Sequence, residues 1–357
     1  MNDKRIDRSK SLEEIEIDDS DSNYIIREDW EGFEKFHNNQ TNKFYDVFKE
    51  EVVSHNLKRP DKDRLLSLAG IPRYGGDLRV SDRNVKEKLH DFVHHSLVDY
   101  FPTFDEEFHF YFATVVDDRW IFPYDKPVGN FYDIRERVQR VLRDKGTLSA
   151  FGIVEFDVQK NSHVFNGKRA LMAHAHLLLW QKEKVPAITI ESSLEHHFKS
   201  KATDRTFHVS KVKYRKNIFK IASYISKVPP GAKLRWVLSG SDGDYTAEHK
   251  HVELVPSEVI RLMEINSEIH VNSLFIGVGK NGDVAKELKK SIKSQFTQWH
   301  REQINLSKNK NKSVSKPYSS RGIYLDQTRA TWAYIKKKYG FKNMAPSELV
   351  YKRSRRR

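Results

Sequence analysis

The chain has 357 residues, of which 38% are hydrophobic and 12% aromatic, so it can form a sizeable core and is not disordered overall. It has no cysteine, which excludes a disulfide scaffold, a thiol nucleophile and any cysteine-ligated metal. The 63 Lys and Arg residues against 49 Asp and Glu give a formal net charge of +14, which favours a polyanionic partner.

The two ends of the chain differ in charge. Residues 1–40 carry 12 acids and 6 bases, and 1–21 is interpreted as an acidic disordered tail. This start resembles neither a signal nor a transit peptide, and no apolar run approaches the roughly 20 residues of a membrane span, so we expect a cytoplasmic protein with no membrane partner. Residues 301–357 carry 16 bases and 3 acids. Within them, 307–357 is interpreted as a basic linker, a helix (Asp326–Tyr339) and a tail suited to phosphate contacts.

Apolar periodicity predicts the elements between these ends. Residues 22–100 have apolar positions three and four apart and form a mostly helical region. Residues 101–240 then predict a strand, a helix, three strands, a helix and a strand. These are Phe108–Val116, Asp133–Arg143, Ala150–Val158, Arg169–Trp180, Thr206–Lys213, Asn217–Val228 and Lys233–Leu238. This order describes an α+β fold with a central, mainly antiparallel sheet and flanking helices, followed by a helical C-terminal region over 241–306.

The residues with the clearest chemistry are His174 and His176. Two histidines one residue apart on a strand point to the same face, so both imidazoles can reach one metal ion. Two half-buried histidines held by hydrogen bonds explain the pattern equally well. A second such pair, His249-Lys250-His251, lies among charged residues and is interpreted as surface.

The sequence Asn166-Gly167 predicts a two-residue hairpin turn between the strands around these histidines. Without a bulge, this turn places Asp157 opposite His176, with Glu155 as a diagonal neighbour. The resulting mixed nitrogen and oxygen donors suit Mg²⁺, Mn²⁺ or Zn²⁺ in a site with open positions.

A third candidate is Tyr224, in the helix Asn217–Val228. Lys220 and Lys227 lie beside it, because residues three and four apart are neighbours on a helix. A phenol has a pKa of about 10 and is a poor nucleophile, but neighbouring ammonium groups favour phenolate, and a metal can polarise the phosphate that it attacks. The alternative is an ordinary interfacial tyrosine with extended lysines.

Together, these motifs resemble the HUH endonucleases, and most of all the single-tyrosine rolling-circle replication initiators of plasmids and phages. The three motifs of that family occur here in order, over about a third of the chain. They are Phe112–Asp118, then Asp157-Val158-Gln159 with His174-Ala175-His176, and then Tyr224–Lys227. The hairpin before the histidines is longer than in most relatives, which leaves either Asp157 or Glu155 as the third metal ligand.

The resemblance implies a fold, a reaction and partners. It implies that residues 101–240 form the HUH core with a ferredoxin-like palm, and that His174, His176 and Asp157 hold Mg²⁺ or Mn²⁺. Tyr224 would attack origin DNA in single-stranded form and leave a 5′-phosphotyrosine and a free 3′-OH, with Lys227 helping at the phosphate. A host polymerase would extend the 3′ end, and a host helicase would unwind the duplex. Basic residues near the nucleophile would bind the DNA: Lys211, Lys213, Arg215, Lys216 and Lys220.

Three alternatives remain open on sequence. A single-tyrosine transposase or a relaxase would use the same chemistry, although relaxases carry three histidines and such transposases are shorter. A non-catalytic DNA-binding initiator or regulator would bind duplex DNA through the basic C-terminal helix. A structural metal site in an RNA-binding protein would need a fourth ligand. The oligomeric state is not determined by the sequence.

Overall fold

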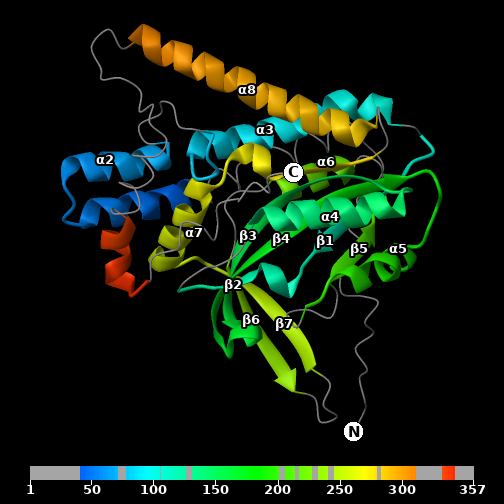
Figure 1. Ribbon diagram of the computed structural model, residues 1–357, viewed down its shortest axis with the longest axis horizontal. Helices are drawn as coiled ribbons and strands as arrows, with labels where there is room; N and C mark the ends of the chain where they lie inside the picture. Colours follow the sequence, from blue (N-terminus) through cyan, green and yellow to red (C-terminus); the bar gives the residue numbers. More distant parts are fainter. Residues whose placement is uncertain are drawn as a thin grey trace, which may run out of the picture.

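The computed structural model describes residues 41–70, 78–104, 106–125, 131–200, 206–213, 217–226, 232–239, 245–279, 283–310 and 332–341. This part of the chain is an α+β fold with a mainly antiparallel open sheet and helices on both of its faces (Figure 1). The coarse fold class expected from the sequence is therefore confirmed.

The described part of the sheet has eight strands, in the order β5-β1-β4-β3-β6-β7, with β2 paired to β4 and β8 paired to β3. The strands are β1 (His109–Val115), β2 (Ile121–Pro123), β3 (Ser149–Ser162), β4 (Lys168–Gln181), β5 (Phe207–Lys211), β6 (Ala232–Ser239), β7 (Tyr245–Val252) and β8 (Phe275–Val278). Only the pairing of β3 with β6 is parallel in this set.

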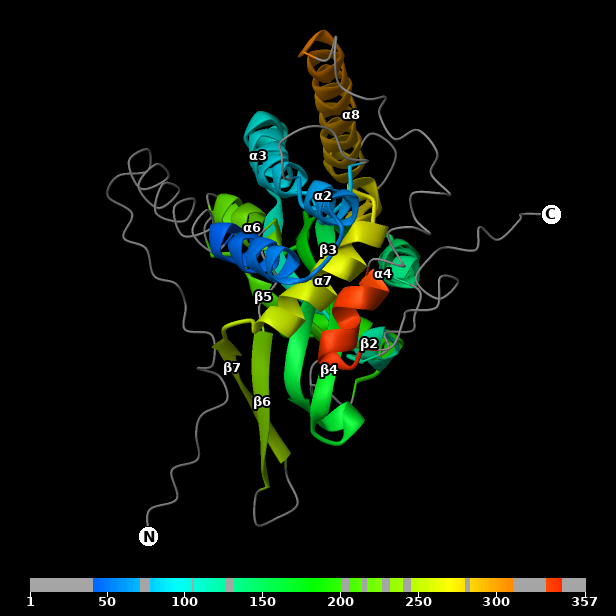
Figure 2. The same cartoon turned by 90° about the vertical axis from the view of Figure 1, so that its left-hand side faces the viewer.

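The helices cover the sheet in two layers. They are α2 (Arg59–Leu68), α3 (Arg83–Tyr100), α4 (Phe131–Lys145), α5 (Ala187–Leu194), α6 (Ile218–Ile225), α7 (Pro256–Glu268) and α8 (Val284–Lys310), with two further helices over 41–54 and 332–339. Helix α4 lies on one face and α6 on the other, as the two perpendicular views show (Figures 1 and 2). Helix α3 packs against both α6 and α8.

Local sequence explains why α3 forms where it does. The side chain of Asp82 accepts hydrogen bonds from the backbone nitrogens of Asn84 (2.8 Å) and Val85 (3.4 Å), which caps the first turn. An apolar stripe at four-residue spacing is then buried: Val85, Leu89, Val93 and Leu97.

One hydrophobic core extends from Phe44 to Ile335 and includes both faces of the central strands. The helices before residue 101 therefore share a core with the sheet. The C-terminal helix 332–339 joins the same core through Trp332, and its Lys336 forms a buried ion pair with Glu264 of α7.

Two expectations for the C-terminal half are corrected. The region 241–306, expected to be helical, contributes strands β7 and β8, because pairing with β6 and β3 extends the sheet past residue 240. Residues 307–310, expected to begin a linker, continue helix α8. The rest of the expected linker and the basic tail lie outside the described residues, as does the acidic start.

Gly152 lies on β3 where a side chain has no room beside β4. It pairs with Leu177, and a Cβ atom on it would lie 2.1 Å from the backbone oxygen of His176. Any side chain at this position therefore pushes on the backbone that carries His176.

We expect Gly152→Ala to lower the free energy of unfolding by at least about 2 kcal/mol, because the added methyl group meets backbone that cannot move away alone. Urea denaturation followed by circular dichroism measures the change. Gly146→Ala is the control, because nothing lies within 4 Å of its Cβ position and only its positive φ of 65° opposes the substitution. A smaller loss for Gly152→Ala than for Gly146→Ala would contradict the steric explanation.

Candidate active site

Both histidines of the sequence motif lie on β4 and point to one face of the sheet. His174 pairs with Glu155 of β3, and His176 pairs with Ile153 of β3 and Thr114 of β1. Because side chains alternate between the faces of a strand, Glu155, Thr114 and both imidazoles share a face. The two histidines therefore have a strand with a polar side chain on each side, Glu155 on β3 and Thr114 on β1.

The strand pairing expected from the turn sequence is wrong by four residues. Asn166-Gly167 does lie in the turn, and both residues have positive φ, 51° and 76°. However, β3 continues to Ser162, and the 3-10 turn His163–Phe165 lengthens the connection. Because the register differs from the expected one by an even number of residues, every side chain stays on its expected face of the sheet. The residue beside the histidines is then Glu155, where Asp157 was expected.

Three ligand atoms form a nearly equilateral triangle. Oε1 of Glu155 lies 2.8 Å from Nε2 of His174 and 2.9 Å from Nε2 of His176, and the two nitrogens are 3.0 Å apart. Neighbouring ligands of an octahedral cation, each about 2.1 Å from it, are about 3 Å from one another. The three atoms therefore fit one face of the ligand shell of a single divalent cation.

The hydrogen-bond geometry of the imidazoles supports the same assignment. If both Nε2 atoms carried a proton and donated it to the same oxygen of Glu155, the two hydrogens would crowd together, because the nitrogens are only 3.0 Å apart. If the two nitrogens and the oxygen instead direct lone pairs at one cation, all three atoms have a partner. Nδ1 of His176 is 3.0 Å from Oγ1 of Thr114, so a proton on Nδ1 can be donated to the threonine while Nε2 stays available. Phe112 stacks on His176, with ring centroids 5.5 Å apart, and holds the ring in place.

Asp157, expected to be a metal ligand, is outside this triangle. Its Oδ2 lies 3.7 Å from Nε2 of His174, and its side chain is buried. It pairs with Met172, two residues along β3 from Glu155 and on the same face of the sheet. Asp157 therefore lies beside the cluster, and Glu155 occupies the position next to both histidines.

Tyr224 lies directly against the cluster. Its ring packs edge-on to His176 at 4.9 Å between centroids and to Phe112 at 5.4 Å. The helix that carries it is fixed to α3, because Oγ of Ser226 is hydrogen-bonded to Nδ1 of His90 (3.0 Å). The tyrosine is still 38% exposed, so its ring faces both the cluster and the surface.

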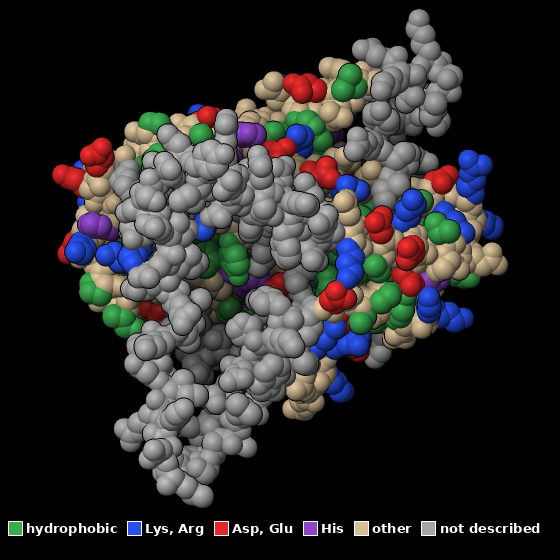
Figure 3. Space-filling model, turned by 180° about the vertical axis from the view of Figure 1, so that it is seen from behind, with side chains coloured by type: hydrophobic (Ala, Val, Ile, Leu, Met, Phe, Trp, Pro, Cys, Tyr) green, Lys and Arg blue, Asp and Glu red, His purple; other side chains and the backbone are tan. Residues whose placement is uncertain are grey.

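The predicted DNA-binding residues are placed only in part. Lys211, Lys213 and Lys220 are exposed, and Lys220 is one turn before Tyr224 on α6. Arg215, Lys216 and the predicted helper Lys227 lie outside the described residues. Histidine and acidic side chains are visible at the middle of the face seen from behind, with hydrophobic side chains beside them (Figure 3).

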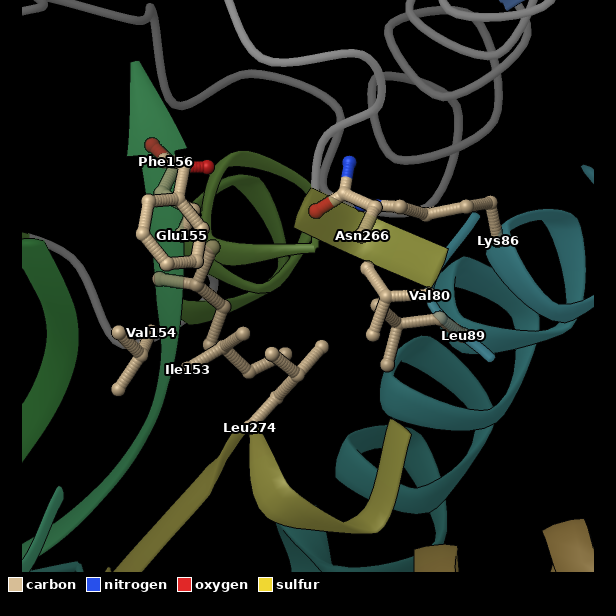
Figure 4. A pocket seen from close by; sticks show the side chains of 10 residues that line it. Val80, Lys86, Leu89, Ile153, Val154, Glu155, Phe156, Asn266 and Leu274 are labelled. Atoms are coloured by element: carbon tan, nitrogen blue, oxygen red, sulfur yellow. The ribbon is translucent and has the colours of Figure 1, made fainter. Parts of the chain in front are cut away.

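A small cavity of about 20 Å³, enough for one water molecule, adjoins the cluster. Glu155 lines it from β3, and Lys86 extends across it from α3 towards Asn266 (Figure 4). Burial lowers the pKa of Lys86 to about 8, and the negative charge of Glu155 partly opposes this shift. The side chain of Lys86 thus lines the same cavity as the carboxylate of Glu155.

Sequence reasoning missed Lys86, Phe112 as a stacking partner and Thr114 as the partner of His176. Thr114 lies in a strand that was expected, but its position opposite His176 depends on the β1–β4 register. Nothing in the local sequence distinguishes Lys86 from Lys88, the other lysine of α3.

Comparisons with protein-family models, with curated proteins and with solved structures give no match. Among the described helices, none combines the length and apolar content needed to cross a lipid bilayer.

Mn²⁺ at 1 mM should raise the melting temperature of the metal-free protein by roughly 2–5 °C, because a cation that binds only the folded state stabilises it. Glu155→Gln should abolish this increase, since the substitution replaces a charged carboxylate with a neutral amide. The matched variant Asp157→Asn changes the neighbouring carboxyl group two residues along the same strand and should keep most of the increase. A loss caused by Asp157→Asn alone would make Asp157 the ligand. Thermal scans after dialysis against EDTA measure these shifts.

The buried Lys86 should make stability depend on alkaline pH. Its pKa is about 8 in the folded state against 10.5 for an ordinary lysine, so between these values the unfolded state binds more protons and stability rises with pH. Relative to Lys86→Met, the wild type should gain about 3 kcal/mol of unfolding free energy from pH 8 to pH 10.5. Urea denaturation of both proteins in EDTA tests this, and a pH-independent difference would contradict it.

Proposed function

We propose that this protein is a metal-dependent HUH endonuclease that nicks single-stranded DNA with Tyr224, and that it initiates rolling-circle replication. One observation carries the proposal. The ring of an exposed tyrosine packs 4.9 Å from His176, which is part of a cluster suited to a divalent cation. The order of the motifs in the sequence supports the same reaction.

The residues of the site have distinct roles in the proposed reaction. A divalent cation held by Glu155, His174 and His176 would polarise the scissile phosphate and stabilise its developing charge. The phenol oxygen of Tyr224 loses its proton and bonds to phosphorus, while the bond from phosphorus to the 3′ oxygen breaks and that oxygen takes up a proton. The products are a 5′-phosphotyrosine and a free 3′-OH, and reversal rejoins the strand.

The donor set favours Mn²⁺ over Mg²⁺ as the cation. Imidazole nitrogens suit transition metals, whereas Mg²⁺ prefers oxygen ligands. With two nitrogens and one oxygen in the triangle, Mn²⁺ should support the reaction at lower concentration than Mg²⁺.

The proposal includes a substrate and partners. Exposed Lys211, Lys213 and Lys220 would bind the phosphates of a single strand that approaches Tyr224. The free 3′ end would be extended by a host polymerase, and a host helicase would open the origin duplex.

Tyr224→Phe should abolish covalent attachment to DNA, because the variant keeps the ring but lacks the attacking oxygen. The assay is a denaturing gel with labelled single-stranded origin DNA, in Mn²⁺ or in EDTA. The wild type should form a metal-dependent adduct, and the variant should form at least about 100-fold less.

Tyr334→Phe is the matched control, because Tyr334 is 50% exposed and lies on the C-terminal helix. An adduct that persists in Tyr224→Phe but disappears in the control would assign the nucleophile elsewhere. Tight, metal-independent binding of duplex DNA with no adduct in any protein would favour the non-catalytic DNA-binding alternative.

A further inference from the structure

A histidine and a buried carboxylate meet at the edge of the sheet, two strands away from His176. Strand β5 is the outermost strand on this side of the described sheet, and α5 packs beside it (Figure 1). Nδ1 of His208, on β5, lies 3.2 Å from Oε2 of Glu191, on α5. Neither residue belongs to the candidate metal site.

The strand pairing places His208 on the same face of the sheet as the candidate metal site. Thr114 of β1 pairs with His176 on one side and with His208 on the other, and directly paired residues of antiparallel strands share a face. Two strand spacings of about 4.8 Å separate the Cα atoms of His176 and His208 by about 10 Å. His208 is therefore too far away to join the metal ligands, but a DNA strand that reaches Tyr224 can extend over it.

The face between the metal site and the edge of the sheet is partly accessible. Along β1 and β5, the residues on this face are half-buried, namely Phe112, Thr114, His208 and Ser210. The residues that alternate with them, such as Ala113 and Val209, are buried on the opposite face. A ligand can therefore contact both strands from the side on which the ring of Tyr224 packs against Phe112.

The carboxylate of Glu191 holds the imidazole of His208 in one orientation. The side chain of Glu191 is buried, and its Oε2 also accepts a hydrogen bond from the backbone nitrogen of Val209 (2.9 Å). Because the two nitrogens of an imidazole point in nearly opposite directions, Nε2 of His208 points away from Glu191. The side chain of His208 remains 26% exposed, and Oγ of Ser210 lies 3.4 Å from Nε2. The site thus combines a fixed, accessible imidazole with a neighbouring hydroxyl group.

We propose that His208 and Ser210 bind a second phosphate of the DNA strand whose scissile phosphate lies at Tyr224. An imidazole with protons on both nitrogens donates one to Glu191 and the other to a phosphate oxygen, and the hydroxyl of Ser210 can donate to the same phosphate. Contacts of this kind fix the position of a strand without reading its bases. The identity of the ligand as a single DNA strand rests on the proposed function, but binding at His208 is measured without cleavage.

The test compares two variants of the full-length chain that change histidines on opposite faces of the sheet. His208→Gln removes the imidazole on the face of Tyr224. His109→Gln is the matched control, because His109 is also half-buried but lies three residues before Phe112 on β1 and so on the opposite face. Fluorescence anisotropy with a labelled single strand of about 20 bases, in EDTA and from about 50 to 200 mM salt, measures binding. The buffer is at about pH 6, where an ordinary imidazole is largely protonated.

His208→Gln should bind the strand about 10-fold more weakly at about 100 mM salt, because a charge-assisted hydrogen bond is lost. Its salt-dependence slope should fall by about 0.7, the value of one phosphate contact on a single strand. The control variant should change affinity less than about 2-fold and keep the slope. Equal losses in both variants, or no loss in His208→Gln, would overturn the proposal. A loss with an unchanged slope would also overturn it, because it would assign His208 a role in the fold.

Two further measurements keep the outcome interpretable. Melting curves show whether His208→Gln folds, and Ser210→Ala replaces it if it does not, with an expected loss of affinity of about 3-fold or more. Adduct formation by the wild type with origin DNA in Mn²⁺ is measured in parallel. A wild type that forms no adduct contradicts the proposed function, whereas the binding comparison alone decides whether His208 and Ser210 contact a phosphate.

Discussion

The register between β3 and β4 is the constraint on which the site depends. It sets Glu155 opposite His174 and brings three ligand atoms within 3.0 Å of one another. Gly152 lets the two strands approach closely just beside His176, so the same ladder that supplies the ligands leaves no room for a side chain behind them. A shift of this register by one residue would turn the cluster residues of one strand to the opposite face of the sheet. The pairing of the strands therefore matters more than any single residue of the cluster.

The nucleophile candidate depends on a second set of contacts, from the helices that cover this face. Tyr224 reaches His176 because α6 packs on β4, and α6 is itself tied to α3 through Ser226 and His90. Helix α3 in turn is capped by Asp82 and carries Lys86 to the cavity behind Glu155. The Glu155–His174–His176 cluster therefore comes from the sheet and the tyrosine from a helix, and α3 contacts the helix that carries the tyrosine.

Ionisable groups gather at more than one place in the fold. Beside the histidines, the carboxyl groups of Glu155 and Asp157 both lie near Nε2 of His174. On α8, burial and neighbouring positive charges lower the pKa of Lys289 and of Lys293. Crowded ionisable groups are common at functional sites, whereas a structural ion pair brings opposite charges together. The buried pair of Lys336 and Glu264, in which opposite charges meet, is of the structural kind.

The sequence by itself determined the α+β class, the main strands and helices of the central region, and the shared face of His174 and His176, because these follow from periodicity along one chain segment. The sequence also identified Tyr224 as a candidate nucleophile. Only the tertiary structure decided whether Glu155 or Asp157 lies beside the two histidines. The whole connection between β3 and β4 sets their register, and the Asn-Gly pair within it does not set it alone. The tertiary structure likewise decided that β7 and β8 join the sheet and that Thr114 and Lys86 adjoin the site, since these contacts link residues distant in sequence, and local pattern carries no information about them.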